Sequence, residues 1–344
     1  MNRSVEGTAM DDQQPTERTE SPHGAAEAPR ANGRRWAGWI DLIGLTVSIA
    51  ALVMVIGALQ PRFLSTDQWS SIANQIPELL VIVIGMTLVL IVGGIDLSVG
   101  SVMALSSAVI GVLLERKLGL MVAVPAGIAA GAVCGAINGG ISIGLRVPSF
   151  IVTLGMLQGA RGLAYLLTDS QTVYLGKKIG SIASPLPGIG VSTAFLVALL
   201  LAIVAQLLLG RTILGRHLVA IGTNEGAVRL SGIRVWPAKL FPFVLVGAMA
   251  GLAGWFSSAR LSSVNPNEGN GIELSAIAAV VIGGTSLMGG RGSVTASFLG
   301  VVLVAVLTSG LAALNVSEPY KLLITGGVIV AAVLVDVLRR RESR

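Results

Sequence analysis

Six polar or charged residues interrupt stretches of this sequence that are otherwise apolar. They are Asp96, Asn138, Thr153, Gln158, Arg161 and Glu273. Carboxylate, amide, hydroxyl and guanidinium groups are costly in such surroundings, and they commonly mark a solute path or a moving part. The chain has one cysteine and two histidines, too few for a metal cluster, and no nucleophilic triad is recognisable. We therefore predict a translocation path or gate at these six positions, with no cofactor and no enzyme active site.

Two of the charged residues, Arg161 and Glu273, carry the largest cost. A charge at the centre of a bilayer costs about 2.5–3.5 kcal/mol on insertion scales. Glu273 falls at the start of a predicted helix, where its charge favours the positive end of the helix dipole. The long side chain of Arg161 can reach an interface, or it can face protein or water. We predict that Arg161 faces protein or a water-filled path, and not lipid.

The composition shows what must position these groups. Hydrophobic residues make up 53% of the chain and charged residues 12%, about half the roughly 25% of a soluble domain. The mean hydropathy is +0.80. The 44 glycines suit membrane helices, whose backbones approach closely at small residues. We therefore predict an all-α polytopic membrane protein, surrounded mostly by lipid.

Ten windows with few or no charges are candidates to cross the membrane, because a span of the ~30 Å hydrocarbon core needs roughly 20 apolar residues. The windows are 42–61, 74–92, 97–114, 118–145, 147–168, 193–209, 240–259, 274–290, 292–317 and 320–338. Residues 1–35 are polar and of mixed charge, with no apolar segment of the kind found in signal peptides. We expect 1–35 to be a disordered cytoplasmic tail and 36–344 to be the transmembrane domain.

The basic residues set the predicted orientation. With the tail inside and ten crossings, sixteen of the 24 Lys and Arg residues fall in inside segments and seven in outside segments, while Arg161 lies within a span. Basic residues concentrate in cytoplasmic loops, which explains the net charge of +6 without a nucleic-acid partner. We expect both termini and the loop 210–240 to be cytoplasmic.

Two glycine-rich segments, 93–101 and 283–293, break the helical pattern. Each follows an aliphatic run and precedes a new helix. We expect Asp96 or Ser98 to cap the helix that starts in the first break, because both side chains accept hydrogen bonds from free backbone N–H groups. A hinge or gate in the same segment is compatible with that role. The likeness of the two breaks indicates an internal duplication.

Four glycines at four-residue spacing mark one face of the fourth predicted helix. They are Gly127, Gly131, Gly135 and Gly139. A stripe of small residues predicts a close contact between two helices. The contact can lie within the chain or between two copies.

The loop 210–240 is the longest polar interruption after the tail. Thr223 or Asn224 can cap a short helix over 225–230, and Gly232 can end it. Such a short helix is unstable alone, so we expect it to dock on a cytoplasmic partner. The chain has no GxxxxGK[ST] segment, so any ATP-binding site lies on another chain.

The short helix has two kinds of side chain with which to dock. Glu225 and Arg229 are four residues apart and therefore share one face. We expect these two charges to fix the register on the partner. We expect Ala227, Val228 and Leu230 to supply the apolar contact.

Four motifs occur in order and together carry a resemblance. They are GGIDLSVGS at 93–101, RVPSFIVTLGMLQGARGLAYLLT at 146–168, AIGTNEGAVRLSGI at 220–233 and ELSAIAAVVIGGTSLMGGRGS at 273–293. With them the chain, over about residues 40–340, resembles the permease subunits of bacterial ABC importers for monosaccharides, of the ribose, xylose and galactoside type.

The resemblance implies a fold, a localisation and partners. The fold is that of the ten-helix, type II importers, in a bacterial inner membrane. The partners are a second permease copy, most simply an identical one, two cytoplasmic ATPase subunits and a periplasmic sugar-binding protein. The loop 210–240 then holds the coupling helix, and Asn224, Glu225, Ala227, Arg229 and Gly232 match the docking segment of the family. Gly226 stands where alanine is usual.

Other functions remain as alternatives. Branched-chain amino-acid permeases share the architecture, but Asp96, Ser98 and Val99 favour the sugar group. An ion-coupled secondary transporter needs several embedded carboxylates, and only Asp96 and Glu273 qualify, both near helix ends. The sugar itself, a pentose, a hexose or a related polyol, is left open, since in such importers the binding protein selects it.

Overall fold

The computed structural model describes residues 31–342. The chain divides into two units, of which the first ends at Gly38 and the second is Trp39–Arg344. The fold described below is that of the second unit. The predicted tail lies outside the described residues up to residue 30, and its last residues are helical, because α1 begins at Ala31.

The described residues are mostly helical, with two short 3-10 helices (η) and two short strands. The elements in order are α1 (Ala31–Leu59), η1 (Pro61–Leu64), α2 (Thr66–Ile91), α3 (Val99–Glu115), α4 (Leu120–Gly144), α5 (Ser149–Leu167), β1 (Val173–Tyr174), η2 (Gly176–Ile179), α6 (Thr193–Arg211), α7 (Ile213–Leu230), α8 (Val235–Leu261), β2 (Ser263–Val264), α9 (Ile272–Ile282), α10 (Val294–Ala313) and α11 (Glu318–Glu342).

Each of the ten predicted windows contains a helix. In the described part of the chain, seven helices are long and apolar enough to cross a membrane, namely α1, α2, α4, α5, α6, α8 and α10. Two apolar helices are shorter, α3 with 17 residues and α9 with 11. An 11-residue helix is about 17 Å long, roughly half the hydrocarbon core. A polytopic helical membrane protein is therefore confirmed, while the count of ten crossings stays a prediction.

Two features of the fold depart from the predictions. The loop 210–240 holds a further helical segment before the predicted helix over 225–230, because α7 begins at Ile213 and is divided at Asn224. The side chain of Thr212 caps its start by accepting from the Gly215 N–H at 3.1 Å. The chain also has a two-stranded antiparallel pairing of β1 with β2, in which Val173 faces Val264. This pairing satisfies backbone groups where two interhelical connections meet.

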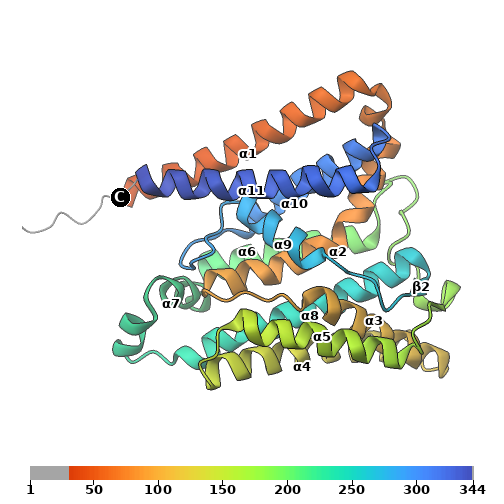
Figure 1. The fold of residues 1–344 in the computed structure, drawn as a ribbon, viewed down its shortest axis with the longest axis horizontal. Coiled ribbons are helices and arrows are strands. Elements are labelled where there is room, and N and C mark those ends of the chain that lie inside the picture. Colours follow the sequence, from red (N-terminus) through yellow and green to blue (C-terminus); the bar gives the residue numbers. More distant parts are fainter. Residues whose placement is uncertain (1–30, 343–344) are drawn as a thin grey trace, which may run out of the picture. The chain divides into compact units, whose positions relative to one another are not determined.

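The helix α2 is the centre of the fold. Its residues from Glu78 to Ile91 are buried all round apart from a partly exposed Leu79, as expected for a helix that is apolar on every face. It packs against α6, α8, α9 and α10. The helix α4 packs against both α8 and α5. Figure 1 shows these three helices side by side, with α7 at one end of the group and β2 at the other. We call these the α7 end and the strand end.

The glycine stripe of α4 makes its close contact within the chain. A Cβ added at Gly131 would lie 2.2 Å from the carbonyl oxygen of Gly247 in α8, and one at Gly135 would lie 2.0 Å from that of Phe243. Both distances are far below any real carbon–oxygen contact, so only glycine allows the two backbones to approach this closely. The stripe thus fixes α8 against α4, and α8 carries the residues that meet α7.

Candidate functional site

The first glycine-rich break leaves an unwound segment between α2 and α3. Unwound backbone inside a membrane protein must find hydrogen-bond partners within the protein. Two side chains of α5 provide them. The Ile95 N–H donates to Ser149 Oγ at 2.9 Å, and the Leu97 N–H donates to Thr153 Oγ1 at 3.1 Å. The first turn of α5 therefore holds the unwound segment in place.

A buried polar cluster lies at the end of this segment. Asp96 Oδ1 accepts from the Ser98 N–H at 2.8 Å and from Ser98 Oγ at 2.6 Å. Asn138 of α4 donates from Nδ2 to Ser98 Oγ at 2.9 Å and to Asp96 Oδ2 at 3.3 Å. All three residues are buried. The structure thus brings together Asp96, Asn138 and Thr153, three of the six predicted path residues.

The cluster decides between the two predicted caps. Asp96 accepts the N–H of Ser98, the residue before α3, whereas the Ser98 side chain makes no capping hydrogen bond. Ser98 has helical backbone angles, φ −90° and ψ −8°, instead of the extended angles of a capping residue, and its hydroxyl bonds to Asp96 and Asn138. Asn138 Oδ1 has no partner among the described residues.

The second glycine-rich break and α7 both contact the end of α2, just before the first break. The Gly290 N–H donates to the Ile91 carbonyl, at the end of α2, at 2.9 Å. A Cβ added at Gly222 of α7 would lie 1.8 Å from the same carbonyl oxygen and 2.5 Å from Gly290 N. Gly290 itself has a φ of +76° and lies against Thr223. Three backbones, from α2, α7 and the 283–293 segment, therefore meet at one point.

Arg161 binds the connection between α8 and α9. Its Nη1 donates to the Pro266 carbonyl at 2.5 Å and to the Glu268 carbonyl at 2.8 Å. On the next turn of α5, the Tyr165 hydroxyl donates to Asn267 Oδ1. The guanidinium therefore contacts protein, and two side chains of α5 clamp this connection.

The clamped connection runs back along α3 into the helix bundle. Val264 lies against Gly111, near the end of α3, and Gly269 lies against Gly100, in its first turn. Glu273 then falls in the first turn of α9, as predicted, with a carboxylate oxygen 2.6 Å from where a Cβ of Gly100 would be. Among the described residues, neither Arg161 nor Glu273 forms a hydrogen bond with the Asp96 cluster.

Gln158, the sixth predicted path residue, belongs to neither group. It lies on an exposed face of α5 together with Gly155, Gly159 and Gly162. A Cβ added at any of these glycines would meet nothing within 4 Å. This face of α5 is therefore uncovered in the single chain.

The predicted docking segment has the expected cap. Asn224 has non-helical backbone angles, with φ −158° and ψ 93°, and its Oδ1 accepts from the Ala227 N–H at 3.0 Å. Asn224 thus divides α7 and starts a second short helix. Gly232 follows that helix with a φ of +77°, a conformation that favours glycine at a helix end.

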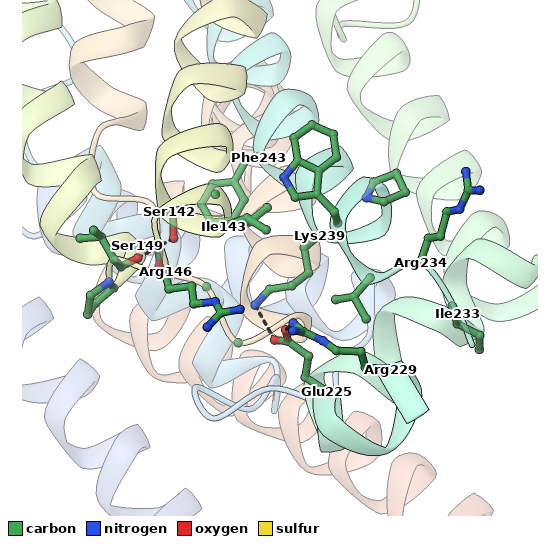
Figure 2. Close-up of a pocket in the computed structure, with 18 residues that line it drawn as sticks. Ser142, Ile143, Arg146, Ser149, Glu225, Arg229, Ile233, Arg234, Lys239 and Phe243 are labelled. Carbon is green, nitrogen blue, oxygen red and sulfur yellow. Dashed lines mark hydrogen bonds and ion pairs between the residues drawn. The ribbon is translucent and has the colours of Figure 1, made fainter. Parts of the chain in front are cut away.

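Glu225 joins this short helix to α8. Its carboxylate accepts from Arg229 at 2.6 Å and from Lys239 Nζ at 2.8 Å (Figure 2). The Lys239 ammonium, as a hydrogen-bond donor, lowers the pKa of the Glu225 carboxyl, and Arg229 adds to the effect. Glu225 therefore stays ionised at neutral pH, and it positions the short helix on the chain as well as facing outward.

The apolar side chains of the segment divide differently from the prediction. Val228 is buried against Ile221, Val235 and Ala238, so its predicted role in partner contact is wrong. Its helical phase turns it toward α8, which follows directly in the chain. Ala227 is exposed, and Leu230 is 92% exposed. Of the three apolar residues predicted to contact a partner, only Ala227 and Leu230 are therefore exposed for it.

Sequence reasoning missed several residues of these sites. Lys239, Ser149 and Tyr165 pair with residues that are distant in the sequence, and no local pattern indicates their roles. Gly222 carried a weak signal, a glycine inside a helix. Within the described residues, no three His, Cys, Asp or Glu side chains lie together in a way that could hold a metal ion.

Comparison with known proteins places the chain among transport-system permeases. A family model described as "Branched-chain amino acid transport system / permease component" matches residues 68–333. Because this match covers more than half of the chain, the chain belongs to that family. No solved structure matches the chain.

Three curated relatives indicate which kind of permease this chain resembles. The ribose import permease protein of Escherichia coli strain K12 is 38% identical over 314 residues, which cover 89% of this chain and 97% of the relative. The D-allose transport system permease protein of the same strain is 34% identical, with 91% and 97% covered. The L-arabinose ABC transporter permease protein of Azospirillum brasilense is 30% identical, with 96% and 97% covered.

These relatives confirm the resemblance drawn from the four motifs. They are permease components of transport systems and not enzymes, so the prediction of a transport subunit is confirmed. Although the family description mentions amino acids, all three relatives carry sugar names. They favour the monosaccharide ABC importer class over both the amino-acid and the ion-coupled alternatives.

Proposed function

We propose that this chain is the membrane-spanning subunit of an ATP-driven importer that moves a small sugar, a pentose, hexose or related polyol, delivered by a binding protein. The observation that carries the proposal is the likeness to ribose, allose and arabinose permeases over nearly the whole chain. The proposed fold is that of the type II importers with ten crossings. A separate ATPase subunit supplies the energy.

The contacts of α7 support a specific coupling route. The ATPase grips the segment from Asn224 to Gly232, of which Ala227, Arg229 and Leu230 are exposed. Directly before this segment, Gly222 lies against Ile91 and Gly290. Movement of α7 therefore acts directly on the second glycine-rich break and on the end of α2, which leads into the first break. No helical hydrogen-bond ladder maintains the geometry of either break.

The two breaks in turn control the path. The first break holds Asp96 and is tied to α5 by Ser149 and Thr153. On the same helix, Arg161 clamps the α8–α9 connection. A shift of the unwound segment therefore moves α5, and α5 carries the Arg161 clamp with it. In this way a movement of α7, caused by the ATPase, changes the access of sugar to the path at the strand end.

A second permease copy is proposed to pack on α5. The exposed glycines of this helix, Gly155, Gly159 and Gly162, leave open space beside them, and small residues allow close approach of another membrane helix. Gln158 then faces the space between the two copies, where a sugar passes. An identical copy is the simplest partner.

The proposed orientation puts the α7 end and both termini in the cytoplasm, and cysteine labelling tests it. Lys239, near the start of α8, binds Glu225, whereas Trp255, near its end, donates to the carbonyl of Ile179 in η2. The two sites are about 24 Å apart along the helix. In a Cys134→Ser background, Lys177→Cys should react with an impermeant thiol reagent from outside, and Leu230→Cys should react only after permeabilisation. The reverse pattern contradicts this orientation.

Co-purification and uptake test the function. The chain should co-purify with an ATPase subunit, and proteoliposomes that contain both should take up sugar only with ATP and the binding protein. Uptake without ATP, driven by an ion gradient alone, contradicts the proposal. A panel of pentoses, hexoses and polyols offered to the binding protein identifies the solute.

A further inference from the structure

A large cavity opens at the α7 end of the chain, between the α4–α5 turn, the short helix of α7 and the start of α8. Its volume is about 1000 Å³, at the upper end of the range for small-molecule sites. We call it the basic cavity and define it by Arg146, Glu225, Arg229, Trp236, Lys239 and Phe243. The proposed coupling contacts use Glu225 and Arg229, but they assign no role to the space itself.

The basic cavity has more positive than negative groups. Arg146, Arg229 and Lys239 come from three different elements, and Figure 2 shows all three reaching toward Glu225. Glu225 pairs with Arg229 and Lys239. Arg146 forms no ion pair with any described residue. One carboxylate therefore faces three cations, which leaves a net charge of +2 among these four side chains.

The position of Arg146 supports a ligand role. It stands in the turn between α4 and α5 with a φ of +56°, a conformation that is uncommon for residues other than glycine. It is exposed, and Figure 2 shows its guanidinium directed into the cavity beside Lys239. Arg234 also lines the cavity, but Figure 2 draws its guanidinium pointing away from the others. Arg146 is therefore the third cation directed into the cavity, together with Arg229 and Lys239.

The backbone adds positive potential to the same space. Both α5 and α8 begin at the cavity wall, after Pro148 and Arg234, and neither residue makes a side-chain capping hydrogen bond. The first N–H groups of a helix carry partial positive charge and favour anions. This effect reinforces the three cationic side chains.

Much of the remaining wall is apolar, so the part of the ligand that carries the phosphate can itself be partly apolar. Phe243 and Val147 line the cavity, and the Trp236 ring at its edge is 51% exposed. A guanidinium fork beside an ammonium group suits phosphate oxygens, which accept two parallel hydrogen bonds from arginine. We propose that the basic cavity binds the phosphate group of an amphipathic or small organic ligand, either the headgroup of an anionic phospholipid or a soluble phosphate ester.

Binding to the full chain, without any ATPase, tests this site independently of sugar uptake. The soluble probe is glycerol 3-phosphate, compared with glycerol, on protein in dioleoylphosphatidylcholine nanodiscs. The lipid probe is dioleoylphosphatidylglycerol, compared with dioleoylphosphatidylcholine, counted by native mass spectrometry on detergent-solubilised protein. We expect at least one phosphate probe to bind in preference to its counterpart, with a raised midpoint of thermal unfolding.

Variants at Arg146 connect the binding to this cavity. Arg146→Ala should weaken binding of the preferred probe by about tenfold, the usual effect of removing one charge-assisted hydrogen bond. Arg146→Lys should retain part of the affinity. Arg116→Ala, which removes an exposed arginine at the strand end, is the matched control and should leave binding unchanged.

The outcomes separate the sources and can overturn the proposal. A response to the lipid alone assigns a headgroup site, and a response to glycerol 3-phosphate alone assigns a soluble ester. The proposal is overturned when neither probe is preferred, or when Arg146→Ala binds as the parent does. It is also overturned when Arg146→Ala affects only co-purification of the ATPase, because the cavity then belongs to a protein interface.

Discussion

Replacing Gly222 by valine should abolish sugar-stimulated ATP hydrolysis and reduce uptake to less than about a tenth of the parental rate. Even a Cβ at this position would lie 1.8 Å from the Ile91 carbonyl oxygen and 2.5 Å from Gly290 N. Both neighbours are backbone atoms, one at the end of α2 and one in the second glycine-rich break, so α7 itself must move away. Overpacking of this kind costs about 1–3 kcal/mol or more, enough to separate the coupling segment from the breaks.

A matched variant separates this contact from a general effect of added bulk. Gly210 lies near the end of α6, and a Cβ there would meet nothing within 4 Å, so Gly210→Ala should transport normally. Gly222→Ala should be intermediate between the parent and Gly222→Val. Parental uptake by Gly222→Val would show that the contact of α7 with the breaks does not carry the coupling.

Removing the Arg161 clamp should have the second largest effect. Arg161→Leu loses two charge-assisted hydrogen bonds, to the carbonyls of Pro266 and Glu268, each worth about 1.5–3 kcal/mol. The α8–α9 connection should then open more often, with faster amide hydrogen exchange over 262–271. Uptake should fall by about tenfold or more, because the path at the strand end then opens and closes independently of ATP hydrolysis.

Two controls accompany this variant. Arg161→Lys keeps the charge but lacks the guanidinium fork, so it should recover part of the uptake. Arg116→Leu removes an exposed basic residue at the same end of the bundle and should transport as the parent does. If Arg161→Leu is expressed and transports as well as the parent, the clamp has no role in transport.

The sequence correctly predicted those features of the structure that depend only on residues close together in the chain. The Asn224 cap, the end of the helix at Gly232 and the placement of Glu273 in a first helical turn all follow from capping and dipole rules. The helical windows follow from apolar length alone. The glycine stripe of α4 correctly predicted a close contact, but the partner helix was not determined, since Gly247 and Phe243 lie more than a hundred residues further on.

The wrong or incomplete predictions concern features that are determined by contacts between distant parts of the chain. Val228 was assigned to the outward face because the sequence does not show which side of the short helix packs on its neighbours, whereas in the structure Val228 is buried against Ile221, Val235 and Ala238. Asp96 and Ser98 are equally good caps in isolation, and the local sequence does not show that Ser98 takes helical backbone angles while Asp96 accepts its N–H. Arg161 binds backbone carbonyls, which every residue has, so no residue type in the sequence marks its partners.

The central claim is that an ATPase drives sugar transport through the second half of α7, and one double variant tests it most directly. Glu225→Lys combined with Arg229→Glu keeps an ion pair within the short helix, but it places a lysine opposite Lys239 and reverses the outward charges. The measurement is sugar-stimulated ATP hydrolysis by the reconstituted complex of permease, ATPase and binding protein, with the midpoint of thermal unfolding of the permease as the control for folding. We expect an unfolding midpoint close to the parental value together with loss of stimulation and of uptake. Parental stimulation and uptake in the double variant would contradict the claim.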